Sequence, residues 1–104
     1  MIRKFFGDGE RDFALPANMI HELERVTGNG IGELFRKATA NTYRFTEVAE
    51  TIRLAMIGGG TSPADASALV TAYVGTEGNP FVAAHMLALD ILTDFYAGAS
   101  DEPA

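Results

Sequence analysis

Three consecutive glycines, Gly58, Gly59 and Gly60, interrupt the most regular stretch of the chain, residues 46–74. Before them, apolar residues recur at helical spacing, which predicts a helix over about 46–57. Gly58 lacks a Cβ and can therefore take the left-handed conformation that ends a helix. The glycines predict a tight structural hinge, and this hinge limits how the rest of the chain can fold.

A second helix is predicted directly after the glycines. Ser62 offers a hydroxyl that can cap free backbone N–H groups, and Pro63 suits the first helical turn, where a missing N–H costs nothing. The following residues place apolar side chains on one face: Ala66, Leu69, Val70, Tyr73 and Val74. We therefore expect a helix over 63–74 that packs against the first as a helical hairpin, with Ser62 and Pro63 completing the hinge.

The N-terminal residues 2–15 carry a strand pattern. Two short runs flank Gly7-Asp8-Gly9, whose residues tolerate the positive φ of a tight turn. This predicts a β-hairpin with an apolar face formed by Ile2, Phe6, Phe13 and Leu15. Two strands alone are only marginally stable in water, so this face must lie on helices or pair with another chain. Phe6 and Phe13 are therefore candidate partner-binding residues.

The remaining segments predict three more helices, over 17–27, 31–40 and 80–97. Glycines end the first of these, and Asn79-Pro80 supplies a cap and a first-turn proline for the last. Tyr43 and Phe45 are expected to plug the core from a loop. The fold class is mainly α (α+β): an N-terminal hairpin followed by a compact bundle of about five helices in a single domain over 1–97. The acidic tail 98–104 is expected to be disordered.

The last helix is more apolar than one buried face requires. At 100° per residue its apolar side chains cover an arc of about 200°, whereas a surface helix needs a stripe of roughly 100°. Either the helix is central to the bundle, or one edge of the arc is a seam with a partner. Leu87 and Leu89 lie near opposite edges, and Tyr96 lies within the arc. These three are candidate partner-binding residues, whereas His85, without a second His or a Cys nearby, is expected to be structural.

Charge is distributed unevenly along the chain. The formal net charge is −6, and all Lys and Arg residues lie between Arg3 and Arg53, so only acidic charges follow. Because nucleic acids are bound largely through Lys and Arg, we expect no nucleic-acid partner. The acidic half is either a solubilising surface or a docking face for a basic partner. Without a membrane-spanning apolar run or a signal-peptide pattern, a cytoplasmic protein that does not bind membranes is expected.

Candidate chemical motifs are incomplete. Residues 8–12 resemble the start of a calcium loop, but Phe13 occupies the position of its invariant glycine. His21 begins a zinc-protease-like pattern whose second histidine is replaced by Arg25. The glycine loop 58–62 can offer N–H groups to an anion but lacks the lysine of a phosphate loop. With no cysteine and no nucleophile arrangement, we expect no enzyme activity, no metal and no cofactor.

Four segments occur in a characteristic order over roughly residues 3–95. They are FFGDGERDFAL at 5–15, IxxLExxxGxGIGxL at 20–34, EVAETIRLAMIGGG at 47–60 and PxxAxxLV at 63–70. In this order they resemble the tail assembly chaperones of gene transfer agents and siphophage-like particles in alphaproteobacteria. The resemblance implies a protein in the bacterial host cytoplasm that binds the tape-measure protein, keeps it soluble and assists assembly of the tail tube protein around it.

Members of that family have also been described as tail tube proteins. Tube subunits are β-sandwich-like and need many alternating strands, whereas only the first 15 residues of this sequence have that pattern. A chaperone for amphipathic helices needs exposed apolar grooves that self-association covers, so a homo-oligomer is expected. Two alternatives stay open: a structural tail subunit (tail tube or connector) retained in the particle, and a small anion- or ligand-binding regulator that uses the 58–62 loop.

Overall fold

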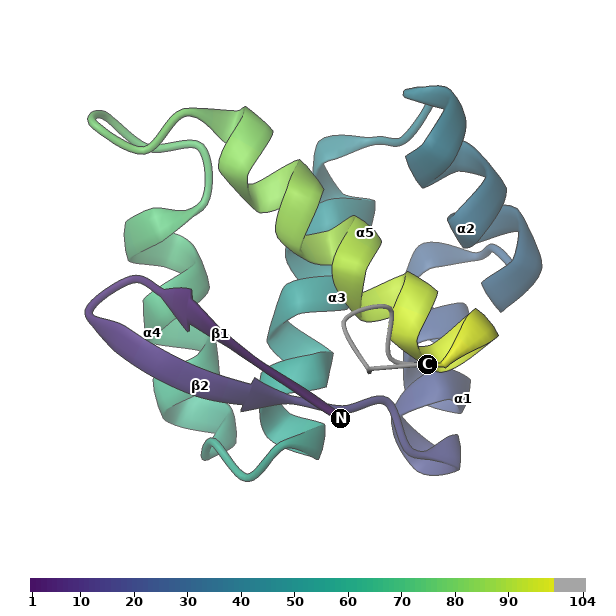
Figure 1. Cartoon of the computed structure of the whole chain (residues 1–104), viewed down its shortest axis with the longest axis horizontal. Helices are drawn as coiled ribbons and strands as arrows, with labels where there is room; N and C mark the ends of the chain where they lie inside the picture. Colours follow the sequence, from purple (N-terminus) through teal and green to yellow (C-terminus); the bar gives the residue numbers. More distant parts are fainter. Residues whose placement is uncertain (99–104) are drawn as a thin grey trace.

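The computed structural model describes residues 1–98, and the expected disordered tail lies outside them apart from Gly98. An N-terminal hairpin precedes five helices, which confirms the predicted mainly α fold class (Figure 1). The elements are β1 (Ile2–Phe6), β2 (Gly9–Phe13), α1 (Ala17–Thr27), α2 (Ile31–Ala40), α3 (Phe45–Gly58), α4 (Pro63–Tyr73) and α5 (Phe81–Ala97).

Helix α3 is the centre of the molecule. It packs against α1, α4, α5 and β2, and Figure 1 shows the other elements arranged around it. Three of its side chains, Ile52, Ala55 and Met56, have no exposed surface. A helix covered on several sides must be apolar on more than one face, which explains why so many residues of α3 are apolar.

The hairpin lies on the helices through its apolar face. Strands β1 and β2 pair antiparallel, with Phe6 opposite Gly9 and Ile2 opposite Phe13. Phe6 and Phe13 are both buried, and Phe6 makes edge-to-face contacts with Phe13 and with Tyr73 of α4 at centroid distances of 6.4 and 6.2 Å. Of the two expected ways to cover this face, the structure shows packing on helices.

The triple glycine joins α3 to α4, and the positive φ expected at Gly58 occurs instead at Gly60. Gly58 is still helical and ends α3, Gly59 has an ordinary φ of −87°, and Gly60 alone of the three has a positive φ, 114°. A Cβ on Gly58 would lie 2.1 Å from the carbonyl oxygen of Ala14, and one on Gly59 would lie 2.0 Å from that of Asp12. Gly58 and Gly59 are therefore required by the close approach of the end of β2 and the residue that follows it, not by a left-handed cap.

The predicted start of α4 is confirmed, whereas two other local predictions are wrong. The Ser62 hydroxyl accepts a hydrogen bond from the Asp65 N–H at 3.2 Å, and Pro63 is the first residue of α4. Asn79 does not cap α5, because its side chain donates instead to Thr76 and Glu77 in the preceding turn. Phe45 does not plug the core, since it begins α3 and is 54% exposed.

We expect Gly59→Ala to destabilise the protein by about 2 kcal/mol or more, because its methyl group would displace the Asp12 carbonyl. For a domain of this size such a loss lowers the Tm by roughly 10 °C. Gly32→Ala is the matched control: Gly32 lies exposed in α2, no atom lies within 4 Å of its Cβ position, and alanine favours helix there. Thermal unfolding that leaves Gly59→Ala at the wild-type Tm would contradict the packing explanation.

Candidate functional site

Within residues 1–98 no group of three or more His, Asp or Glu side chains could hold a metal ion, and no helix is long and apolar enough to cross a membrane. His85 lies with its Nε2 2.8 Å from the Ala38 carbonyl oxygen and stacks on Tyr43 at 4.5 Å. Its contacts are those of the structural residue expected from the sequence.

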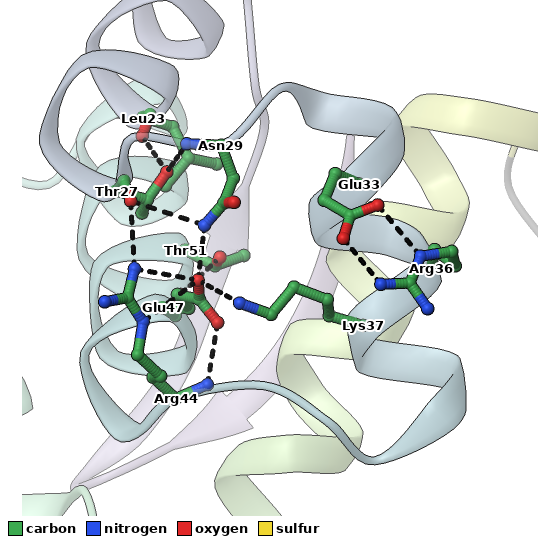
Figure 2. Close-up of polar contacts among 9 residues, drawn as sticks. All are labelled: Leu23, Thr27, Asn29, Glu33, Arg36, Lys37, Arg44, Glu47 and Thr51. Atoms are coloured by element: carbon green, nitrogen blue, oxygen red, sulfur yellow. Dashed lines mark hydrogen bonds and ion pairs between the residues drawn. The ribbon is translucent and has the colours of Figure 1, made fainter.

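One ionised side chain, Glu47, lies inside the protein. Glu47 is in the first turn of α3, only 2% exposed, and Figure 2 shows three neighbouring side chains converging on its carboxylate. Its Oε2 accepts hydrogen bonds from Lys37 Nζ at 2.7 Å and from Asn29 Nδ2. Its Oε1 accepts a hydrogen bond from the backbone N–H of Arg44 at 2.7 Å. Arg44 Nη2 in turn donates to the Thr27 carbonyl at 3.1 Å. The cluster joins the end of α1, helix α2 and the start of α3.

The environment of Glu47 keeps it ionised. Burial by itself would raise the pKa of this carboxyl, but the Lys37 and Arg44 hydrogen bonds and the Lys37 charge outweigh burial and hold the pKa below its ordinary range. Both carboxylate oxygens have donors, so the group is suited to joining helices rather than to exchanging protons. Sequence reasoning treated this residue only as part of a helix. The feature of the sequence that could have identified it is an acidic residue at the third position of that helix, from which a Glu side chain can reach back to the backbone at the helix start.

The described surface has an apolar stripe on the outward side of α5, which we call the α5 stripe. It consists of Val82, Met86, Leu89, Thr93 and Tyr96, alternately four and three residues apart. Val82, Met86 and Tyr96 are 65, 50 and 61% exposed. The opposite side of the helix carries the buried residues Ala84, Leu87, Ala88, Ile91 and Leu92. A spacing of four and three is that of the seam along which two helices pack in a coiled coil.

The surroundings of the α5 stripe are acidic and partly aromatic. Apart from His85, the only acidic or basic residues in α5 are Asp90 and Asp94, and no Lys or Arg follows Arg53 in the chain. Asp94 pairs with the N-terminal amino group of Met1 at 2.9 Å. At the other end, Tyr96 stacks on Phe35 of α2 with ring centroids 4.8 Å apart, which holds its ring while leaving it exposed.

The candidate partner-binding residues fall into two groups. Phe6, Phe13 and Leu87 are at most 8% exposed, so they are mainly core residues, although Phe6 and Leu87 also reach the wall of a groove at the end of β1. Leu89 is half-buried and Tyr96 is exposed, and both belong to the α5 stripe. Sequence reasoning missed Val82 and Met86, although the spacing of four and three was present in the sequence. The α5 stripe is therefore the better-defined contact surface.

We expect Glu47→Gln to lower the free energy of unfolding at neutral pH by about 3 kcal/mol, since Lys37, only 15% exposed, loses its counter-charge. Because the folded-state pKa of Glu47 is depressed, its contribution is present above the unfolded pKa and is lost as pH falls through the folded one. The difference between wild type and variant should thus shrink on acidification. Urea unfolding across this pH range measures it.

Glu33→Gln is the matched control, because Glu33 also pairs with a basic side chain, Arg36, but on the exposed surface of α2. An exposed pair is screened by water, so this variant should unfold almost like the wild type. If Glu47→Gln and Glu33→Gln behave alike at neutral pH, the buried carboxylate does not hold α1, α2 and α3 together.

Comparison with known proteins assigns the chain to a family. Residues 1–98 match the model of the family described as phage tail tube protein, GTA-gp10. Neither the curated proteins nor the solved structures give a significant match. The family match covers every residue that the structure describes, from the hairpin to the end of α5. The chain therefore belongs to the phage tail tube protein GTA-gp10 family and is a tail protein of a phage or gene transfer agent.

Proposed function

We propose that this protein is a tail assembly chaperone that acts without catalysing a reaction. It binds amphipathic helical segments of the tape-measure protein in the cytoplasm of the bacterial host. It keeps them soluble until tail tube subunits assemble around them, and it then leaves the particle. Self-association that covers the same apolar surface in the absence of the partner belongs to this proposal.

The α5 stripe is the observation that carries the proposal. Val82, Met86 and Tyr96 expose apolar surface in a line along the helix, where solvent-facing residues are ordinarily polar. The spacing of four and three residues matches the ridge that a second helix covers, because a helical partner meets the same face every seven residues. The stripe therefore fits an amphipathic helix better than a flat or extended partner.

Charge narrows the kind of helix that fits. Asp90 lies next to the stripe, and the chain from residue 54 to residue 98 has no Lys or Arg. Basic residues flanking the apolar face of a partner helix would therefore meet Asp90 and no Lys or Arg of α4 or α5, which favours correct encounter and orientation. The same acidic surface disfavours nucleic acid.

A structural tail subunit is the second candidate, and the family description favours it. Its difficulty is the small amount of strand within residues 1–98: the single sheet has two strands, and its inner face is used by the core. A β-built tube needs sheets that extend across subunits. The third candidate, an anion-binding regulator, rested mainly on the glycine-rich loop. Close packing already explains why positions 58 and 59 are glycines.

Quantitative mass spectrometry of purified particles distinguishes the first two candidates. A chaperone is expected to be absent or far below the copy number of the tube protein, since it leaves before the particle is complete. Recovery of this chain at a fixed stoichiometry with the tube protein would instead identify a structural subunit. The particles must be purified away from free protein before counting.

We expect Met86→Glu to abolish co-purification with the tape-measure protein, because a carboxylate in the centre of the stripe cannot be buried under a partner helix without a large desolvation cost. The fold should survive, since Met86 is half exposed. Ser67→Glu, at an exposed position of α4, adds the same charge elsewhere and should bind normally. The soluble fraction of co-expressed tape-measure protein is the measurement, and equal solubility with both variants would contradict the assigned surface.

A further inference from the structure

The outer edge of β1 has free backbone groups. A two-residue turn, Gly7-Asp8, closes the hairpin at the pair Phe6 and Gly9, so these two residues exchange both hydrogen bonds. In an antiparallel pair bonded positions alternate, so the N–H and C=O groups of Arg3 and Phe5 point away from β2. Within residues 1–98 these backbone groups of Arg3 and Phe5 have no hydrogen-bond partner.

A groove lies at the Phe5 end of this edge, next to the hairpin turn. It has a volume of about 310 Å³ and is enclosed by the end of β1, Tyr73 of α4, the turn before α5 and the first half of α5. Phe5 and Phe6 line it from β1, and Ala83, Ala84 and Leu87 line it from α5. The small side chains of Ala83 and Ala84 leave room for the backbone of a bound peptide, and Phe6 and Leu87 make the lining apolar. Arg3 and Lys4 charge the first half of β1, whereas Phe5, 70% exposed, leaves its second half apolar.

The dimensions favour one strand over a second hairpin. A strand added to β1 would lie about 4.8 Å away, and the next strand of a paired hairpin would lie about 10 Å away. Helix α5 forms the far wall of the groove and stands where that further strand would have to be. A volume of about 310 Å³ is also at the low end for binding sites, which suits a short segment rather than a folded chain.

We propose that the outer edge of β1 binds an extended apolar segment of a partner polypeptide as a third strand. The Arg3 and Phe5 backbone groups supply the hydrogen bonds, and alternate side chains of the segment enter the groove over Ala84 and Leu87. The segment's other side chains lie on the charged face of the hairpin, where Arg3 pairs with Asp12 at 2.9 Å. This site goes beyond the proposed function, because it is separate from the α5 stripe and recognises strand rather than helix.

The probe is a displayed library of random peptides about twelve residues long, selected on the full-length immobilised protein. Selected peptides should alternate apolar and polar residues and should slow amide hydrogen exchange at Arg3 and Phe5. Arg3→Pro removes one outward N–H while leaving the β1–β2 ladder intact, as edge prolines do. It should weaken peptide binding about five- to tenfold or more relative to Arg3→Ala, which loses the same ion pairs but keeps the N–H.

Three results would overturn the inference. The first is a failed selection, which yields either no peptide above the level on an unrelated protein or peptides that bind without slowing exchange at Arg3 and Phe5; this exchange is measured on the wild type and does not depend on how the proline variant folds. Equal binding by Arg3→Pro and Arg3→Ala is the second such outcome. A wild-type dimer in light scattering that Arg3→Pro converts to monomer is the third, since it assigns the edge to a second copy. None of these results bears on the α5 stripe, which Met86→Glu tests separately.

Discussion

The architecture depends on a backbone-to-backbone approach between the end of α3 and the segment that leaves β2. The Ala14 N–H donates to the Ala55 carbonyl at 3.0 Å, and the absence of side chains at Gly58 and Gly59 lets the carbonyls of Ala14 and Asp12 come close. This contact fixes the hairpin against the central helix, so Phe6 and Phe13 become part of the core. It also orients β1 with its outer edge toward α5.

Local signals were sufficient to predict most of the fold. Turn and capping residues, such as Gly7-Asp8-Gly9 and Ser62-Pro63, act within a few residues of themselves, and the predicted hairpin and five helices were correct. The reason for the glycines was not predictable, because the close approach involves a segment more than forty residues earlier in the chain. Asn79 failed as a cap because its own turn offered competing acceptors.

The candidate site was less predictable than the fold, for a physical reason. Helix α5 has two apolar stripes, and a single sequence does not say which one the bundle covers. Leu87 and Leu89 both looked like candidates, and only tertiary packing buries the first and leaves the second on the outward side with Met86. The Glu47 cluster was missed likewise, because Lys37 and Asn29 approach it from other elements. Family membership agrees with a tail protein, and the outward stripe is the surface on which the proposed helical partner would dock.

Site-specific cross-linking tests the central claim, docking of a partner helix on α5, most directly. The chain has no cysteine, so Met86→Cys introduces a single reactive site on the α5 stripe, and Ser67→Cys introduces one on an exposed face of α4. Each variant would carry a short photoreactive group and be incubated with the tape-measure protein. The account predicts a cross-linked product from position 86, attached to an apolar helical segment of the tape-measure protein, and little from position 67. Equal yields from both positions, or products that contain only this chain, would contradict it.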